Sequence, residues 1–545
     1  MFKKGDKSNV NNYRPVSLLS CVSKIMEKVV FKHVYNYIKD NNLISPHQSG
    51  FKPGDSTVNQ LSYLYHIFCE ALDKKKDVRI VFCDISKAFD RVWHDGLLYK
   101  LHKFGIHGNL LNWFKDYLSN WKQRVLIRGQ QSELGDIKAG VPQGSNLGPL
   151  LFLVYIEDLT TCVQSNIKLF ADDTSLYIDF ENPYEAKQIL NSDLENIKEW
   201  ANQWLVKFSP SKTKSMTMTF KKRQNPALTF DNSDLVDVEN HRHLGITLSN
   251  NLSWSKHIST LLENVSPMAD VLRKLKYSID RESLEKIYFT FVRPKLEYGS
   301  HIWDGCRKID SDALENFQLE MARIVTGAIR GTSHQLLYEE LNWPLLKDRR
   351  TNMKLKYFCR LVTGDGPEYL SELIPKADPK LHNLRNANNI PLPKCRTESY
   401  KKSFLPSSIS LWNDLPLEDR NLDVINQRQK FIPIKLYQFG QRTQNIKHAQ
   451  LRLRCSKLNA HLFLLHVKDS PSCACGFNFE DCEHYFMQCP LFLVQRQILQ
   501  TKLQTIGLGL VSCDILLYGS ANLDVETNYE IFSAVHEFIR DTDRL

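Results

Sequence analysis

The chain has 545 residues, of which 42% are hydrophobic, and this length allows two to four domains that each bury a core. Its net charge of +10 favours a polyanionic partner, which fits nucleic acid and an anionic membrane surface equally well. The 13 cysteines are mostly scattered singly, which argues against a disulfide framework. Neither an apolar run of the ~20 residues that span a bilayer nor a secretory signal is visible, so we expect an intracellular protein.

Hydrophobic patterning predicts strands and helices in turn along the first half of the chain. The predicted strands are residues 78–85, a hairpin over 168–177, and residues 215–220. The predicted helices are residues 147–156, residues 183–204 and a helical region from 251 to about 331, and a turn falls at residues 45–47. Residues 365–410 are rich in Pro, Asn, Lys and Ser, which predicts a mobile or irregular connector.

Acidic side chains stand at the ends of two of these strands. Asp84 closes a short apolar strand, and Asp172 and Asp173 sit at the expected tight turn of the hairpin. Adjacent carboxylates repel each other unless a cation neutralises them, although each of these acids alone is equally typical of an ordinary turn or cap. Acids that end neighbouring strands can hold two Mg²⁺ ions, which clamp the oxygens of a phosphoryl transfer.

Three segments around these acids carry a family resemblance. Residues 82–90 resemble motif A of reverse transcriptases, residues 139–145 resemble motif B and residues 170–173 resemble motif C. The amino-acid sequences of these motifs are most similar to those of non-LTR retrotransposons of the jockey type. Four further matching blocks keep the family's order: residues 12–18, 48–52, 211–214 and 243–245.

The resemblance implies an α+β fold, a right-hand polymerase with fingers, palm and thumb and a mainly helical C-terminal region that ends in a CCHC zinc knuckle. We expect the following parts: fingers 1–76 with a truncated start, palm 77–250, a thumb-like helical segment 251–331, and a C-terminal region 332–545 with the connector 365–410 and the knuckle 473–489. The family's N-terminal endonuclease is expected to be missing from this chain.

The implied function is that of an RNA-directed DNA polymerase, which extends a primer 3′-OH with dNTPs on an RNA template by a two-metal mechanism. Target DNA is a further expected partner, a membrane is not, and the family is found in the nucleus and the cytoplasm. The alternative is an inactive retrotransposon relic that only binds nucleic acid. An unrelated metal-dependent nuclease is a remote third hypothesis.

The resemblance also assigns the catalytic roles. Asp84 and Asp172 would bridge both Mg²⁺ ions, and Asp173 would complete the carboxylate set. Lys212 matches the motif D lysine, which implies protonation of the pyrophosphate leaving group. In its Ser-Lys-Thr-Lys run, a solvated surface lysine is an equally good interpretation.

Five further residues match positions that bind substrate in the family. Arg14 and Lys52 would contact the triphosphate, although Lys52 replaces the usual Arg and loses bidentate geometry. Phe89 matches the steric gate against a ribose 2′-OH, with core packing as its alternative. Gln143, followed by Gly144, would bind nucleotide or template, and a plain loop is the alternative.

Two more features near these motifs have structural interpretations. Asp90 matches no required ligand and is interpreted as a salt-bridging or capping acid. Residues 243–245 resemble the primer-grip turn, which would hold the primer end near Asp172.

The C-terminal region carries a set of sulfur and imidazole ligands. Cys473, Cys475, His484 and Cys489 have the spacing C-x-C-x8-H-x4-C, which suits one tetrahedral structural Zn²⁺. The set resembles the family's CCHC knuckle but departs from the commoner C-x-x-C opening. Cys482 is a competing ligand, and unpaired buried thiols are the alternative interpretation.

Overall fold

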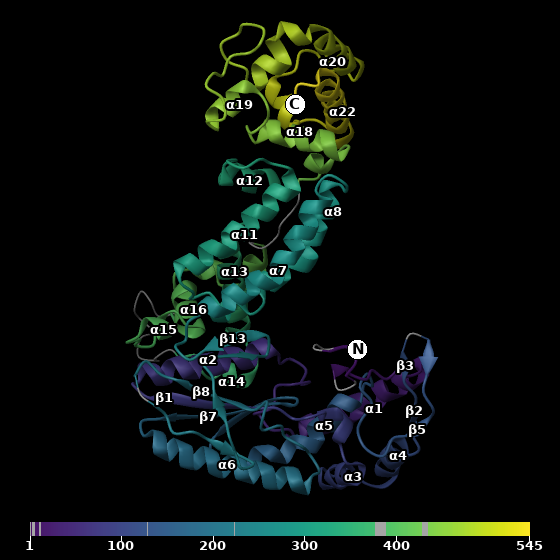
Figure 1. Cartoon of the computed structure of the whole chain (residues 1–545), viewed down its shortest axis with the longest axis vertical. Coiled ribbons are helices and arrows are strands. Elements are labelled where there is room, and N and C mark those ends of the chain that lie inside the picture. Colours follow the sequence, from purple (N-terminus) through teal and green to yellow (C-terminus); the bar gives the residue numbers. More distant parts are fainter. Residues whose placement is uncertain are drawn as a thin grey trace. The chain divides into compact units, whose positions relative to one another are not determined.

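The computed structural model describes residues 2, 6–9, 12–127, 129–222, 224–376, 389–427 and 434–545. The chain divides into two compact units, which we call unit 1 and unit 2 (Figure 1). Unit 1 combines Met1–Ser253 with Arg360–Asp414, and unit 2 combines Trp254–Cys359 with Leu415–Leu545. Each unit is therefore built from two separate stretches of the chain.

Unit 1 holds a mixed set of helices and strands. Its helices are α1 (Cys21–Asp40), α2 (Thr57–Asp73), η2 (Ala88–Arg91), α3 (His94–Lys103), α4 (Gly108–Leu118), α5 (Gly148–Ile156), η3 (Glu157–Thr161), α6 (Pro183–Gln203), α14 (Glu368–Ser371), α15 (Glu398–Lys401) and α16 (Phe404–Asn413). Its strands are β1 (Asp77–Cys83), β2 (Lys122–Gln123), β3 (Leu126–Ile127), β4 (Gln130–Gln131), β5 (Gly135–Asp136), β6 (Asn166–Phe170), β7 (Asp173–Phe180), β8 (Lys214–Met218), β9 (Thr229–Phe230), β10 (Ser233–Asp234), β11 (Val236–Asp237), β12 (Asn240–His243) and β13 (Ile246–Ser249).

The described part of unit 2 is helical. Its helices are α7 (Ser255–Leu275), α8 (Arg281–Ile287), the π-helical η4 (Tyr288–Val292), α9 (Arg293–Glu297), α10 (Ser300–Trp303), α11 (Lys308–Thr326), α12 (His334–Leu341), α13 (Leu346–Val362), η6 (Leu417–Asp419), α17 (Leu422–Gln427), η7 (Lys435–Gln438), α18 (Arg442–Arg452), α19 (Asn459–Leu464), the π-helical η8 (His484–Gln488), η9 (Pro490–Phe492), α20 (Leu493–Thr505), α21 (Cys513–Tyr518) and α22 (Val525–Thr542).

A five-stranded sheet organises unit 1, with the strand order β11-β8-β1-β7-β6. β1 is the central strand of this sheet. All seven of its residues are buried, and Val and Ile are frequent among them, as expected of a strand covered on both faces. It pairs antiparallel with β7 and β8, while β11 runs parallel to β8. α2 lies on one side of this sheet and α6 on the other (Figure 1).

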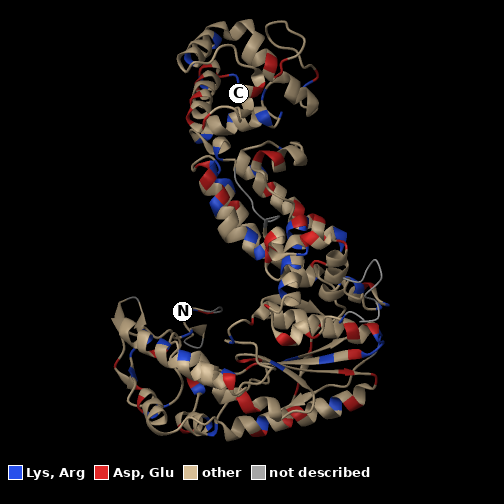
Figure 2. Cartoon of the chain, turned by 180° about the vertical axis from the view of Figure 1, so that it is seen from behind, with Lys and Arg blue, Asp and Glu red and all other residues tan. Residues whose placement is uncertain are grey.

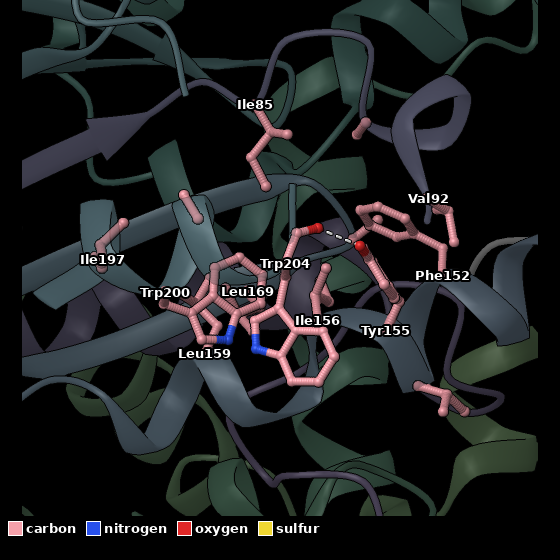
Figure 3. Close-up of a cluster of buried hydrophobic side chains, with 14 of the residues drawn as sticks. Ile85, Val92, Phe152, Tyr155, Ile156, Leu159, Leu169, Ile197, Trp200 and Trp204 are labelled. Atoms are coloured by element: carbon pink, nitrogen blue, oxygen red, sulfur yellow. Dashed lines mark hydrogen bonds between the residues drawn. The ribbon is translucent and has the colours of Figure 1, made fainter. Parts of the chain in front are cut away.

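The core of unit 1 lies between the sheet and the helices α5 and α6. Eight of the nine residues of α5 are buried, so this helix is apolar all round rather than amphipathic. Trp200 and Trp204 lie close to Leu159 and Ile156 in this core (Figure 3). The Tyr155 hydroxyl donates a hydrogen bond to the Trp204 carbonyl, which satisfies a polar group inside the core.

Residues 360–414 return to unit 1 after the chain has passed through unit 2. They bind at the end of α2. The Oδ1 atom of Asp73 accepts a hydrogen bond from the Arg396 N–H at 2.8 Å and another from the Thr397 N–H at 2.6 Å. The Arg396 guanidinium also donates to the Asp73 carbonyl at 2.8 Å. The sequence predicted a connector over residues 365–410. In that stretch the structure has α14, α15 and the start of α16, and residues 377–388 lie outside the described residues.

Buried ion pairs join the two stretches of unit 2. Arg281, on α8, contacts Glu340 at 2.6 Å, and Arg452, on α18, contacts the same carboxylate at 2.7 Å. Exposure of these three side chains is between 1 and 3%, and each charge has an opposite partner. Removing one partner would leave a buried charge uncompensated, at a cost of about 3–5 kcal/mol.

None of the helices in the described part of the chain combines the length and the apolar character that crossing a bilayer requires.

Candidate active site

The sheet register brings the predicted acidic residues to one edge of unit 1. β1 and β7 pair Cys83 with Thr174, and Asp84 follows Cys83 just as Asp173 precedes Thr174, so both acids lie at this end of the strand pair. β6 and β7 pair Phe170 with Asp173, which leaves a two-residue loop of Ala171 and Asp172. Asp173 is thus the first residue of a strand rather than part of the turn, where the sequence analysis had put it.

The three carboxylates interact electrostatically. Partial burial of the Asp173 carboxylate, with repulsion by Asp172 and Asp84, raises its pKa from 3.8 to about 6, and Arg14 opposes this rise. The residue as a whole is exposed to solvent. Among the described residues, the carboxylate oxygens of these three acids do not all lie within 4.8 Å of one another.

Basic residues lie close to this edge. The Lys212 ammonium is 3.4 Å from Oδ2 of Asp84, and both side chains are substantially exposed. Arg14 is near enough to Asp173 for its charge to lower the pKa of that carboxyl. The charge of Lys52 acts on Glu157 and Lys168, so Lys52 is not seen to interact with the three acids.

Phe89 lies in η2, shortly after Asp84, and is half-buried. Its ring stacks on Phe152 with centroids 4.6 Å apart and meets the ring of Phe51 edge-on at 6.0 Å. The side chain therefore packs against the core on one side. The partial exposure keeps the predicted gate role open, because a steric gate needs an accessible ring face.

Gln143 is held by two neighbours. Its Nε2 donates to Oδ1 of Asp90 at 2.8 Å, and its carbonyl accepts from the Ser17 N–H at 2.8 Å. The sequence analysis interpreted Asp90 as a salt-bridging or capping acid. In the structure its carboxylate accepts a hydrogen bond from the Gln143 side-chain amide. Gly144 follows with a φ of 119°, which glycine adopts readily. The motif B loop is thus fixed against motif A.

The segment 243–245 forms the expected turn between β12 and β13. Leu244 and Gly245 have φ values of 45° and 90°, as in a type I′ hairpin. Nε2 of His243 lies 3.3 Å from the hydroxyl of Ser175, which is on β7 two residues after Asp173. The hairpin therefore packs directly beside the strand that carries the acids.

A second candidate site lies in unit 2. The ligand atoms of Cys473, Cys475, His484 and Cys489 all lie within 4.8 Å of one another. The sulfurs of Cys473 and Cys489 are 3.7 Å apart, and the Cys475 sulfur is 3.3 Å from Nε2 of His484. Zn–S bonds of ~2.3 Å in a tetrahedron separate sulfurs by about 3.8 Å, so these spacings fit Zn²⁺.

Cys482 does not join this set. Its sulfur lies 3.8 Å from Nε2 of His461 and 3.8 Å from the Leu451 carbonyl. The structure thus separates the four ligands from the competing cysteine, a choice that the spacing in the sequence left open.

The sequence analysis assigned no role to several residues around the acidic edge, including Gln48 at the start of the matching block 48–52. The Gln48 side chain accepts a hydrogen bond from the backbone N–H of Ala171, beside Asp172, at 3.0 Å. The Lys168 ammonium lies 4.4 Å from the ring centroids of Tyr63 and Tyr369. These contacts join residues more than 100 positions apart, and no local pattern signals them.

The chain is similar in sequence to known proteins. Residues 2–248 match the family model described as "Reverse transcriptase (RNA-dependent DNA polymerase)". The chain is 29% identical, over 64% of its length and 40% of the relative, to "Probable RNA-directed DNA polymerase from transposon BS" of Drosophila melanogaster. It is also 29% identical, over 65% of its length and 40% of the relative, to "RNA-directed DNA polymerase from mobile element jockey" of Drosophila funebris.

Matches that cover more of the chain, and matches to solved structures, have lower sequence identity. The chain is 22% identical, over 92% of its length and 48% of the relative, to "Putative 115 kDa protein in type-1 retrotransposable element R1DM" of Drosophila melanogaster. The solved structure "Structure of apo telomerase from Candida Tropicalis" matches with a TM-score of 0.35 and 10% identity, over 64% of this chain and 55% of that one. A likeness of that size carries no argument.

Proposed function

We propose that this protein, whose residues 2–248 belong to the reverse transcriptase family, acts as the RNA-directed DNA polymerase of a non-LTR retrotransposon. The observation that carries the proposal is the meeting of Asp84, Asp172 and Asp173 at one edge of an antiparallel sheet. The chain spans 40% of the length of the first curated relatives, so the activity is proposed for this part of such a protein.

The acidic edge suits divalent cations. The carboxylates of Asp172 and Asp84 raise the pKa of Asp173, so negative charge is concentrated here, and hard cations such as Mg²⁺ prefer carboxylate oxygens. Asp84 and Asp172 would hold two Mg²⁺ ions, and Asp173 would complete the set. Bound there, the ions would supply charge stabilisation for the attacking and leaving oxygens of an in-line phosphoryl transfer.

The remaining roles belong to the chain's own residues. In the transfer, the primer 3′-oxygen bonds to the α-phosphorus of a dNTP, and the bond from that phosphorus to the pyrophosphate oxygen breaks. Lys212, whose ammonium lies next to Asp84, would give a proton to the leaving group. Arg14 brings positive charge to the triphosphate side, and we keep Lys52 in the same role.

Two residues would choose and align the nucleotide. The half-buried Phe89 would lie under the incoming sugar as a gate against the 2′-OH, and Gln143 would contact the nucleotide or template. Gly144, next to Gln143, would allow the partner to approach the backbone closely.

The nucleic acid partners are an RNA template and a DNA primer or target DNA. The net charge of +10 favours them, although Figure 2 shows basic and acidic residues interspersed along the helices of both units. Local basic residues at the acidic edge would therefore matter more for binding than the overall charge. We expect affinity for primer–template to fall steeply as salt rises.

Primer extension tests the proposal directly. The full chain is incubated with an RNA template, an annealed DNA primer, dNTPs and Mg²⁺, beside Asp172→Asn and the control Asp179→Asn. Asp179 is on β7, the strand that follows Asp172, but pairs with Lys76 at the surface. Wild type and the control should extend the primer, and Asp172→Asn should lose on the order of 100-fold or more. Binding without extension by the wild type would favour the inactive relic instead.

We also infer that Cys473, Cys475, His484 and Cys489 hold one structural Zn²⁺ in a knuckle. The spacing of their ligand atoms supports it, and the ring of Phe477 stacks on His484 with centroids 4.4 Å apart. Packing of this kind fixes the imidazole orientation, as second-shell contacts do at metal sites. A knuckle there would bind the element's RNA or the target DNA and would take no part in the transfer.

A further inference from the structure

We infer that Gln48 is a positioning residue that holds the turn of Ala171 and Asp172 in the shape that binds metal. The inference rests on the proposed function, and it adds a residue that neither the catalytic motifs nor the acidic set contains. Gln48 belongs to a loop between α1 and α2, far from that turn in the sequence.

The contact is made by one buried oxygen. Oε1 of Gln48 accepts hydrogen bonds from the backbone N–H of Gly50 at 2.8 Å and from the backbone N–H of Ala171 at 3.0 Å. Both partners are donors, so the oxygen and not the amide nitrogen must point at them. Gln48 is only 2% exposed, so water cannot replace either bond.

The backbone around Gln48 is paired with the same hairpin. The Leu169 N–H donates to the His47 carbonyl at 2.9 Å, and the Ser49 N–H donates to the Leu169 carbonyl at 2.9 Å. Gln48 and Leu169 thus form a parallel β-bridge. The loop acts as a short extra strand beside β6, immediately before the turn.

The turn needs this support because its backbone is strained. Ala171 has a φ of 55°, a left-handed conformation that is unfavourable for a residue with a Cβ. The loop also packs against the turn without any gap. A Cβ on Gly50 would lie 2.2 Å from the Ala171 nitrogen and 2.7 Å from the Phe170 carbonyl carbon.

The same loop continues towards the substrate side. Phe51 meets Phe89 edge-on, and Lys52, the proposed triphosphate contact, is the next residue. On its other side, the Tyr369 hydroxyl lies 3.4 Å from the Ser49 hydroxyl and donates to Asp55 at 2.9 Å. Gln48 therefore connects the acidic turn to the loop that would hold the nucleotide.

Loss of the Gln48 oxygen has a defined consequence. The Ala171 N–H would be left buried without a partner, and the strained turn would relax. Asp172 is the next residue, so its carboxylate would leave its place opposite the other acids. Partners behind a metal ligand typically change metal affinity 10–100-fold, and we expect about that loss here.

Mn²⁺ binding measures this effect without any need for activity. The full chain and its variants are titrated with Mn²⁺ by electron paramagnetic resonance, and binding that is absent from Asp172→Asn is taken as the signal. Gln48→Met should weaken that binding about 10–100-fold. Gln48→Glu keeps an oxygen in either protonation state and should recover to within about threefold of the wild type.

A matched control comes from the same unit. Gln60, on α2, is also fully buried, but neither atom of its side-chain amide has a hydrogen-bond partner. Gln60→Met should therefore bind Mn²⁺ as the wild type does. Equal weakening in Gln48→Met and Gln60→Met, wild-type binding by Gln48→Met, or no recovery in Gln48→Glu would each overturn the inference.

The outcome is distinguishable from that of the proposed function. A wild-type chain that binds Mn²⁺ through Asp172 but extends no primer refutes the polymerase and leaves the role of Gln48 intact if Gln48→Met still weakens binding. A wild-type chain without Asp172-dependent binding refutes both.

Discussion

Replacement of Asp173 by Asn should stabilise the magnesium-free protein above pH ~6. The carboxylate of Asp173 has its pKa raised from 3.8 to about 6 by partial burial and by its acidic neighbours. A raised pKa means that the folded state binds the proton more tightly than the unfolded state does. The stability is therefore complete below the unfolded pKa and is lost as the pH rises through the folded one.

The magnitude follows from the size of that rise. Going from 3.8 to about 6 corresponds to about 3 kcal/mol at ~1.4 kcal/mol per pKa unit. Water and salt screen an exposed carboxylate, so we discount this to about 1 kcal/mol. Asn has nearly the same shape and no charge. Asp173→Asn should therefore gain about 1 kcal/mol at pH ~8 and nothing at pH ~3, below the unfolded pKa.

Amide hydrogen exchange of the peptide that contains β7 is the suitable assay, because it reports opening of this sheet separately from unit 2. The rates are corrected for their intrinsic pH dependence and converted to opening free energies. Asp179→Asn, further along β7, should change by less than about 0.5 kcal/mol. Added Mg²⁺ should reverse the order, because it stabilises the wild type by binding and Asp173→Asn much less. Equal protection of wild type and Asp173→Asn at pH ~8 without Mg²⁺ would refute the reasoning.

Three further predictions concern single side chains. Asp90→Ala should lower kcat/KM for primer extension by about 10–100-fold, because Gln143 loses a charged acceptor worth about 1.5–3 kcal/mol, and Asp90→Asn should recover most of it. Phe89→Ala should raise the incorporation of ribonucleotides relative to deoxynucleotides. An unchanged ratio together with lower thermal stability would show that Phe89 only packs in the core. Cys489→Ser should lose zinc by elemental analysis, whereas Cys482→Ser should retain one equivalent, and zinc loss in both would contradict the ligand set.

The order of the main elements of unit 1 was predictable from the sequence because its signals are local. Residues 183–204 carry a helical period, and the helix α6 runs from Pro183 to Gln203, where Asn182 caps it by accepting from the Tyr184 N–H. The short apolar run before Asp84 likewise predicts β1. Family motifs added which acids to bring together, and Asp172 and Asp84 lie near enough to raise the pKa of Asp173.

Contacts between distant residues were not predictable. Gln48 meets Ala171 across 123 positions, and Tyr369 meets Asp55 across 314. A lone buried glutamine or tyrosine has no periodic pattern, because its partner is chosen by the tertiary fold. For the same reason the composition of residues 365–410 predicted a connector, whereas Thr397 caps α15 and binds the end of α2.

The acidic edge is a place where function and stability conflict. Asp84 lies near enough to raise the pKa of Asp173, and the left-handed Ala171 and the buried Gln48 hold the turn that places Asp172 next to Asp173. Each of these arrangements costs free energy in a protein without a cation there, through repulsion or backbone strain. A fold that only needed stability would separate the three charges. Because the Gln48 bond and the pairing of β6 with β7 hold Asp172 next to Asp173 against this repulsion, we propose that the edge is a site prepared for cations.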